Sequence, residues 1–251
     1  MPTLEPDILS LEDLVGGYGE LTVLDGASFG VARGAITTLI GPNGAGKSTV
    51  LKAVFGLLPL RRGRVLFDGR DITGSEPRRL LEMGVSYVPQ GRNVFPELSV
   101  LHNLELGATA LRPRAALAER IEAMMERFPA LRQKAHAQAS TLSGGQQKLL
   151  EIARGLLLEP RLMLIDEPSI GLSPVLVQQI FAILEELARG GMTILMVEQN
   201  AKRALEISDY GVVLETGRAR MQGPAGSLLA DPRVGRLFLG GAIEAPDTIA
   251  P

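Results

Sequence analysis

A glycine-rich stretch near the start of the chain has the residue types and the spacing that bind a triphosphate. The stretch is Gly41-Pro42-Asn43-Gly44-Ala45-Gly46-Lys47-Ser48-Thr49, which fits the pattern G-x-x-x-x-G-K-[ST]. Glycine adopts backbone conformations that are closed to other residues, so successive N–H groups can turn inward around phosphate oxygens. Lys47 is placed to reach the β- and γ-phosphates, and the Ser48 hydroxyl is placed to take one position on Mg²⁺. The spacing therefore predicts a triphosphate site that uses Mg²⁺.

The elements on either side of this stretch are the ones that a phosphate-binding loop needs. The apolar run 35–40 predicts a strand before it, and the run 47–55 predicts a helix after it. The N-terminus of that helix carries a partial positive charge and points it at the same anion. An ordinary glycine-rich turn is the alternative. The filled positions of the pattern, in this strand–loop–helix context, favour the phosphate loop.

A second candidate lies much later in the chain, where an apolar run ends in two acids. Residues 162–165 read Leu-Met-Leu-Ile and precede Asp166 and Glu167. Buried parallel strands are continuous apolar runs, and ligands gather at their carboxyl ends. Asp166 is therefore placed to hold Mg²⁺, and Glu167 is placed to polarise a water lined up with the γ-phosphate. A plain turn before Pro168 is the alternative, which the upstream phosphate loop disfavours.

A third stretch is typical of a second anion-binding helix start on the same chain. It reads Leu142-Ser143-Gly144-Gly145-Gln146-Gln147. Ser143 is expected to cap the helix predicted over 145–158, and the two glycines leave backbone N–H groups open to an anion. An ordinary capped helix is the alternative, and it would be preferred if the other two motifs were absent.

The rest of the chain predicts a sheet and crossover helices that position these motifs. Strand-like runs, among them 85–88, 161–165 and 193–197, alternate with helix-like runs such as 174–189, which predicts an α/β fold with a parallel sheet. The middle of the chain, from about residue 98 to 158, is rich in helix-forming residues and indicates a helical insert. With 251 residues, of which 45% are hydrophobic and 22% charged, the chain can bury a substantial core.

Charge and composition argue against several classes of function. The net charge of −2 gives no reason to expect nucleic acid or an anionic membrane as a partner. The absence of cysteine excludes disulfides and thiolate metal sites, and it fits a cytoplasmic protein. No apolar run approaches the ~20 residues of a membrane helix, so we expect any membrane role to come through a partner.

Together the three motifs closely resemble those of the ATP-binding cassette (ABC) ATPases, and the resemblance covers residues 8–241. It implies a P-loop NTPase (RecA-like) core formed by residues 8–90 and 159–241, with an N-terminal antiparallel β subdomain. It also implies an inserted helical subdomain, 91–158, that carries the family's signature sequence. The tail 242–251 is expected to fray.

The resemblance also assigns roles to single residues. Tyr18 matches the aromatic that stacks on adenine, although a strand-end tyrosine is the plain alternative. Gln90 matches the glutamine that contacts Mg²⁺ and the attacking water. The residues implied to bind ATP are Tyr18, Gly41, Pro42, Asn43, Gly44, Ala45, Gly46, Lys47, Ser48, Thr49, Ser143, Gly144, Gly145 and Gln146. The implied ligands of Mg²⁺ are Ser48, Gln90 and Asp166, and the implied catalytic residues are Glu167, Gln199 and Gln90.

Two positions depart from the general family pattern. Ser173 stands where an aspartate usually follows the acidic strand end, and Gln199 stands where a histidine usually follows the next strand. The two histidines of the chain, His102 and His136, lie in the helical middle, so neither is expected at the γ-phosphate. Gln199 can donate a hydrogen bond through its amide, but it cannot titrate.

These departures resemble one branch of the family, the ATPases of branched-chain amino acid importers. The segments that carry the resemblance are 91–100, 166–174 and 197–200. They imply an ATP-hydrolysing subunit that powers uptake of branched-chain or other hydrophobic amino acids through membrane permeases. Its expected place is peripheral, at the cytoplasmic face of the bacterial inner membrane, and an exported solute-binding protein is an indirect partner.

Other functions within the family remain as alternatives at this point. An exporter or a lipid-extraction system could use a closely similar subunit. A soluble ABC ATPase acting on ribosomes or DNA is disfavoured, because such chains usually carry two cassettes or a long coiled-coil insertion. A non-hydrolysing paralogue is disfavoured by Lys47, Asp166 and Glu167.

The resemblance further implies a partner subunit. In the family, the signature sequence lies far from the glycine-rich loop of the same chain. The active form is therefore expected to be a head-to-tail dimer, homomeric or heteromeric, in which Ser143 and Gly145 of one subunit close on Lys47 of the other. Phe95 and Leu98 are expected to bind a short helix of the permease, and core packing in the helical insert is the alternative for both.

Overall fold

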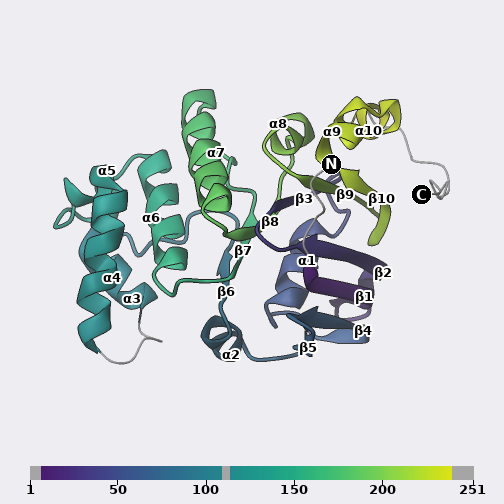
Figure 1. The fold of residues 1–251 in the computed structure, drawn as a ribbon, viewed down its shortest axis with the longest axis horizontal. Helices are drawn as coiled ribbons and strands as arrows, with labels where there is room; N and C mark the ends of the chain where they lie inside the picture. Colours follow the sequence, from purple (N-terminus) through teal and green to yellow (C-terminus); the bar gives the residue numbers. More distant parts are fainter. Residues whose placement is uncertain (1–6, 109–113, 239–251) are drawn as a thin grey trace.

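The computed structural model describes residues 7–108 and 114–238, which form two β-sheets with helices around them (Figure 1). The strands are β1 (Asp7–Tyr18), β2 (Leu21–Ala32), β3 (Ile36–Ile40), β4 (Leu60–Phe67), β5 (Arg70–Asp71), β6 (Val85–Val88), β7 (Leu162–Asp166), β8 (Thr193–Val197), β9 (Tyr210–Glu215) and β10 (Arg218–Pro224). The helices are α1 (Lys47–Val54), α2 (Pro77–Glu82), α3 (Val100–Gly107), α4 (Arg114–Arg127), α5 (Pro129–Arg132), the 3₁₀ helix η1 (Ala139–Thr141), α6 (Gly144–Leu156), α7 (Pro174–Arg189), α8 (Ala201–Glu206), α9 (Ala225–Ala230) and α10 (Pro232–Phe238).

The central sheet has the strand order β10-β9-β3-β8-β7-β6, and its strands are parallel except for β10. Strands β3, β7 and β8 are buried along their whole length, because helices or the other sheet cover both faces. Alternate residues of one strand therefore belong to two cores. In β7, Leu162 and Leu164 join one buried cluster, whereas Met163 and Ile165 join the other.

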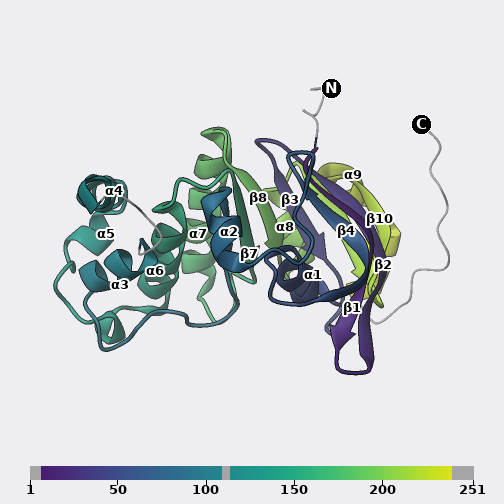
Figure 2. The ribbon, with the colours of Figure 1, turned by 90° about the horizontal axis from the view of Figure 1, so that it is seen from below.

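The second sheet is antiparallel, with the order β2-β1-β4-β5, and it packs over α1 (Figures 1 and 2). Leu9 of β1, Leu51 of α1 and Leu195 of β8 lie in the same buried cluster. Helix α1 is thus held between the two sheets. Because α1 begins at Lys47, this packing also fixes the end of the glycine-rich loop.

Helices α3 to α6 gather at the end of the molecule away from the antiparallel sheet (Figures 1 and 2). Leu104 of α3 and Leu150 of α6 belong to the buried cluster that also covers Ile165 of the central sheet. Helices α6 and α7 connect this helical part to the sheet, because both contribute to that cluster. The proposed division of the chain at residues 90 and 158 stays a prediction.

The α/β fold class predicted from the sequence is confirmed. The runs 85–88 and 193–197 are strands β6 and β8, and the run 174–189 is helix α7. Strand β2 is not predicted from the sequence. Every second residue is buried toward the end of this strand, but Gly26, at φ 91°, interrupts the alternating pattern. The tail 242–251 lies outside the described residues.

Candidate nucleotide site

The glycine-rich loop joins the end of β3 to the start of α1, as the sequence predicts. Gly41 approaches another backbone so closely that a Cβ built there would lie 2.1 Å from the Leu214 carbonyl oxygen. Gly46 is the N-cap of α1 and has a left-handed φ of 101°. Both positions therefore need glycine, and the loop leaves its N–H groups at the N-terminus of a buried helix.

Lys47 is only 5% exposed and folds back onto its own loop. Its ammonium donates hydrogen bonds to the carbonyl oxygens of Gly41, over 2.9 Å, and Pro42, over 3.1 Å. Burial lowers the pKa of Lys47, and the carboxylates of Glu167 and Asp166 oppose that shift. The ammonium thus lies in a field of acids, at the position from which a bound phosphate would be contacted.

Ser48 and Asp166, which are far apart in the sequence, lie in direct contact. Ser48 Oγ donates a hydrogen bond to Asp166 Oδ1 over 2.8 Å, and the Tyr87 hydroxyl lies 3.4 Å from Asp166 Oδ2. Burial raises the pKa of Asp166, which is 1% exposed, and these two hydroxyls oppose the shift. A hydroxyl and a carboxylate are the oxygen ligands that Mg²⁺ prefers, so the pair fits the metal that the family uses.

Glu167 follows Asp166 and is held by contacts on two sides. Gln90 Nε2 donates a hydrogen bond to Glu167 Oε2 over 2.8 Å, and the Glu167 N–H donates to the Val197 carbonyl oxygen over 2.9 Å. The residue is 8% exposed. Burial raises the pKa of its carboxyl, Asp166 raises it further, and Lys47 opposes the shift. A carboxylate with a raised pKa beside a phosphate loop is suited to general-base chemistry.

Tyr18 lies at the end of β1, beside the helix that begins with the phosphate loop. The residue is 47% exposed, and the Lys52 ammonium of α1 lies 5.8 Å from its ring centroid. An exposed aromatic face next to α1 is available for stacking. The contact of Tyr18 with adenine stays a prediction.

The start of α6 has the predicted cap. Ser143 Oγ accepts a hydrogen bond from the Gln146 N–H over 3.3 Å, and Gln146 Oε1 accepts one from the Ser143 N–H over 3.1 Å. Gly145 also has a packing role, because a Cβ there would lie 2.6 Å from Leu176 Cδ2 of α7. In both views α6 lies with the helices at one end, and α1 lies under the antiparallel sheet (Figures 1 and 2).

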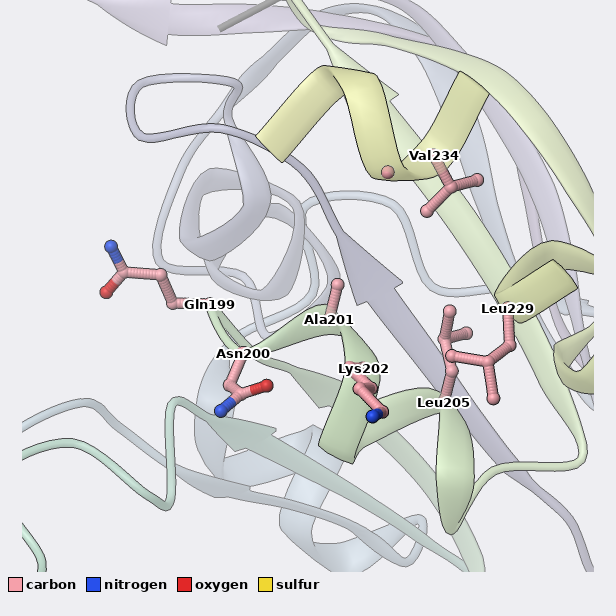
Figure 3. Close-up of a pocket in the computed structure, with 8 residues that line it drawn as sticks. Gln199, Asn200, Ala201, Lys202, Leu205, Leu229 and Val234 are labelled. Atoms are coloured by element: carbon pink, nitrogen blue, oxygen red, sulfur yellow. The ribbon is translucent and has the colours of Figure 1, made fainter. Parts of the chain in front are cut away.

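Gln199 is exposed in the loop between β8 and α8. It is one of the residues that line a cavity of about 470 Å³, together with Leu205, Leu229 and Val234, although its amide is directed away from those three side chains (Figure 3). The residues that line this cavity come from 199–205 and 229–235, so it does not include the glycine-rich loop. Ser173 is exposed at the N-cap of α7, where its side chain makes no capping hydrogen bond.

Two residues of the site were missed by sequence reasoning. Tyr87 contacts Asp166, and burial raises the pKa of its phenol. Glu198, 1% exposed at the end of β8, accepts hydrogen bonds from Ser169 and Gln199. An acid directly after a buried apolar strand was the available signal for Glu198, whereas nothing local indicated the contact of Tyr87.

Comparison with known proteins agrees with this geometry. The family model described as "ABC transporter" matches residues 24–170. The chain belongs to the ABC transporter family, and within it to the ATP-hydrolysing, ATP-binding subunits. It is 39% identical over 234 residues to the high-affinity branched-chain amino acid transport ATP-binding protein BraG of Pseudomonas aeruginosa, covering 93% of this chain and 100% of BraG.

Two further similarities cover most of the chain. It is 38% identical over 228 residues to the probable branched-chain amino acid transport ATP-binding protein LivF of Archaeoglobus fulgidus, covering 90% of this chain and 96% of LivF. Among solved structures, an ATP-binding cassette of an ABC transporter, MJ1267, matches with a TM-score of 0.84 and 33% identity. That match covers 93% of this chain and 99% of the cassette.

Among the helices of residues 7–108 and 114–238, none is both long enough and apolar enough to span a membrane.

Proposed function

We propose that the chain powers the uptake of branched-chain or other hydrophobic amino acids, as a peripheral subunit at the cytoplasmic face of a bacterial inner membrane. The relatives named for branched-chain amino acid transport support the solute class. The observation that carries the ATPase chemistry is the pairing of Ser48 with Asp166 and of Gln90 with Glu167, beside the buried Lys47.

Hydrolysis assigns one task to each of these groups. Lys47 exchanges the carbonyl oxygens of its loop for the β- and γ-phosphates of ATP, which keeps its ammonium paired. Glu167 accepts a hydrogen bond from the water that attacks the γ-phosphate and receives its proton, and Gln90 orients that carboxylate. Ser48, Asp166 and Gln90 would hold Mg²⁺, which supplies positive charge to the phosphate oxygens.

The second phosphate-binding helix start, at Ser143, supports a dimeric arrangement. Helix α6 lies with the helices at one end of the molecule, whereas α1 lies apart from them, beside the antiparallel sheet, so one chain does not bring the start of α6 to the start of its own α1 (Figure 1). In a head-to-tail pair, each α6 start would close the phosphate site of the other subunit. ATP would then hold the pair together, and hydrolysis would release it, because the γ-phosphate contacts are lost.

Attachment to a permease is proposed at the loop before α3. Phe95 is 46% exposed, and the Arg154 guanidinium of α6 lies 5.2 Å from its ring centroid. Leu98 is only partly buried. An exposed aromatic ring that is held by a buried helix is suited to receive an apolar side chain of a partner. Core packing, the alternative for these residues, is disfavoured for Phe95 by its exposure.

The exporter alternative is not favoured, because the two curated relatives described above are named for branched-chain amino acid transport. We propose no nucleic-acid partner, since the net charge is −2.

Uptake of labelled amino acid tests the proposed solute class. The chain is expressed together with the permease subunits and the exported binding protein of a branched-chain amino acid importer, in cells that lack their own importer. We expect uptake of labelled leucine with the wild-type chain and background uptake with Lys47→Ala, because that variant lacks the cation that binds the phosphates. Accumulation of only a chemically unrelated solute, or export of leucine, would show that the proposed function is wrong.

A further inference from the structure

Glu198 is a buried carboxylate that the proposed hydrolysis leaves without a role. It is 1% exposed and stands at the end of β8. Its Oε1 accepts a hydrogen bond from the Ser169 N–H over 2.9 Å. Its Oε2 accepts one from Ser169 Oγ over 2.8 Å and one from the Gln199 N–H over 3.1 Å. One side chain therefore joins the loop after β7 to the loop after β8.

The loop after β7 contains a strained residue next to the atoms that Glu198 holds. Glu167 has a φ of 46°, a left-handed conformation that is uncommon for residues other than glycine. Such conformations persist where surrounding contacts over-determine them, and they cluster at active sites. The Glu167 N–H is fixed by the Val197 carbonyl oxygen. Two positions further on, Ser169 is fixed by Glu198.

We infer that Glu198 is a positioning residue for ATP hydrolysis. It fixes the position of the loop that carries Glu167 relative to the loop that begins with Gln199. The inference rests on the roles proposed above for Glu167 and Gln199. Three donors converge on Glu198, namely the N–H and hydroxyl of Ser169 and the N–H of Gln199. An ionised carboxylate satisfies all three, since it accepts on both oxygens and donates nothing.

The isosteric variant Glu198→Gln separates positioning from simple packing. Glutamine fills the same space, but one oxygen becomes an NH₂ group, which is a donor. In either orientation of the amide, a backbone N–H of Ser169 or Gln199 then faces a donor and loses its acceptor. Ser169→Ala is the matched variant, because it removes the hydroxyl and keeps the backbone bond to Glu198.

The test measures kcat and KM for Mg-ATP on the full chain in solution, together with amide hydrogen exchange. We expect Glu198→Gln to lower kcat about tenfold and Ser169→Ala to lower it about threefold, with KM within about twofold of wild type in both. The double variant should be no slower than Glu198→Gln alone, because both changes act on the same contact. Amides of 167–170 and 199 should exchange faster in Glu198→Gln, while those of β3 stay unchanged.

A Glu198→Gln variant with wild-type kcat overturns the inference. A Glu198→Gln variant whose kcat falls while its KM rises by the same factor, and whose amide hydrogens exchange faster throughout the chain, overturns it as well. If Glu198→Gln fails to fold, Ser169→Ala decides, because wild-type kcat in that variant contradicts the inference. Glu167→Gln is measured in parallel. If Glu167→Gln hydrolyses ATP at the wild-type rate, the proposed role of Glu167 is wrong. If Glu198→Gln hydrolyses ATP at the wild-type rate and Glu167→Gln does not, only the inference about Glu198 is wrong.

Discussion

Gln199 occupies the position where a histidine is usual in the family, and it is exposed at the end of β8. Its contact with a γ-phosphate would be a neutral hydrogen bond, which contributes about 0.5–1.5 kcal/mol net. Gln199→Ala is therefore expected to slow ATP hydrolysis by at most about tenfold, since each 1.4 kcal/mol is a factor of ten. Steady-state phosphate release measures this. If Gln199→Ala were as inactive as Glu167→Gln, then Gln199 would take part in the chemistry itself.

The pH profile of kcat/KM distinguishes Glu167 from residue 199. Burial holds the pKa of Glu167 above the ordinary glutamate value, and a base must be ionised to act. Activity is therefore full above this raised pKa and is lost as the pH falls through it. Gln199→His should add a group that titrates near pH ~6.5, which wild type lacks at this position. Superimposable profiles for wild type and Gln199→His would contradict the proximity of residue 199 to the reacting phosphate.

The part of the site that the sequence predicts depends on whether the contacting residues are near each other or far apart in the chain. The glycine-rich loop is a local pattern, so its residues and its strand–loop–helix context were predictable. The position of Asp166 followed from the end of an apolar run. The contacts of Tyr87 with Asp166 and of Glu198 with Ser169 were not predictable, because they depend on the order of strands in the sheet.

At the scale of elements, a buried ion pair within α6 holds the loop before α3 through hydrogen bonds made by both of its members. Lys148 Nζ lies 2.5 Å from Glu151 Oε2, and the two side chains are 5% and 3% exposed. Glu151 Oε1 accepts a hydrogen bond from the Asn93 N–H over 2.6 Å, and Lys148 Nζ donates one to the Gly91 carbonyl oxygen over 3.1 Å. The helix that begins at Ser143 and the loop that carries Phe95 are thus fixed to each other.

Breaking this pair should destabilise the chain strongly. Glu151→Ala leaves Lys148 buried without a counter-charge, which costs roughly 3–5 kcal/mol. For a chain of this size, that corresponds to a fall in Tm of about 6–20 °C. Glu105→Ala, at an exposed position on α3, is the control and should stay within about 0.5 kcal/mol of wild type. Thermal unfolding followed by circular dichroism measures both, and equal melting of the two variants would contradict a structural role for the pair.

The elements themselves were predictable where the apolar pattern is regular. Strands β6 and β8 and helix α7 follow from continuous or helical spacing. Strand β2 is not predicted, although Phe29 and Val31 are buried in the core, because Gly26 interrupts the alternating pattern before them. The short strand β5 and the edge strand β10 have few buried residues, and a weak pattern leaves such edges unpredicted.

At the scale of the whole molecule, the two helices whose starts we propose to bind phosphate lie apart, α6 among the helices at one end and α1 beside the antiparallel sheet (Figure 1). This separation is the physical reason for a dimer, since a γ-phosphate needs charge stabilisation on both sides. The variant Ser143→Asp examines that arrangement without loss of the helix cap, because aspartate is also a good N-cap. Its negative charge would face the phosphates across the interface.

The most direct test of the account is the oligomeric state and turnover of Glu167→Gln with Mg-ATP. The amide keeps the shape of the side chain and removes the charge that accepts the proton, so ATP should bind and remain. We expect this variant to elute as a dimer from a sizing column and to release no phosphate above background, while Glu167→Gln combined with Ser143→Asp elutes as a monomer. Wild-type phosphate release by Glu167→Gln, or an ATP-bound dimer that forms equally well with Ser143→Asp, would contradict the account.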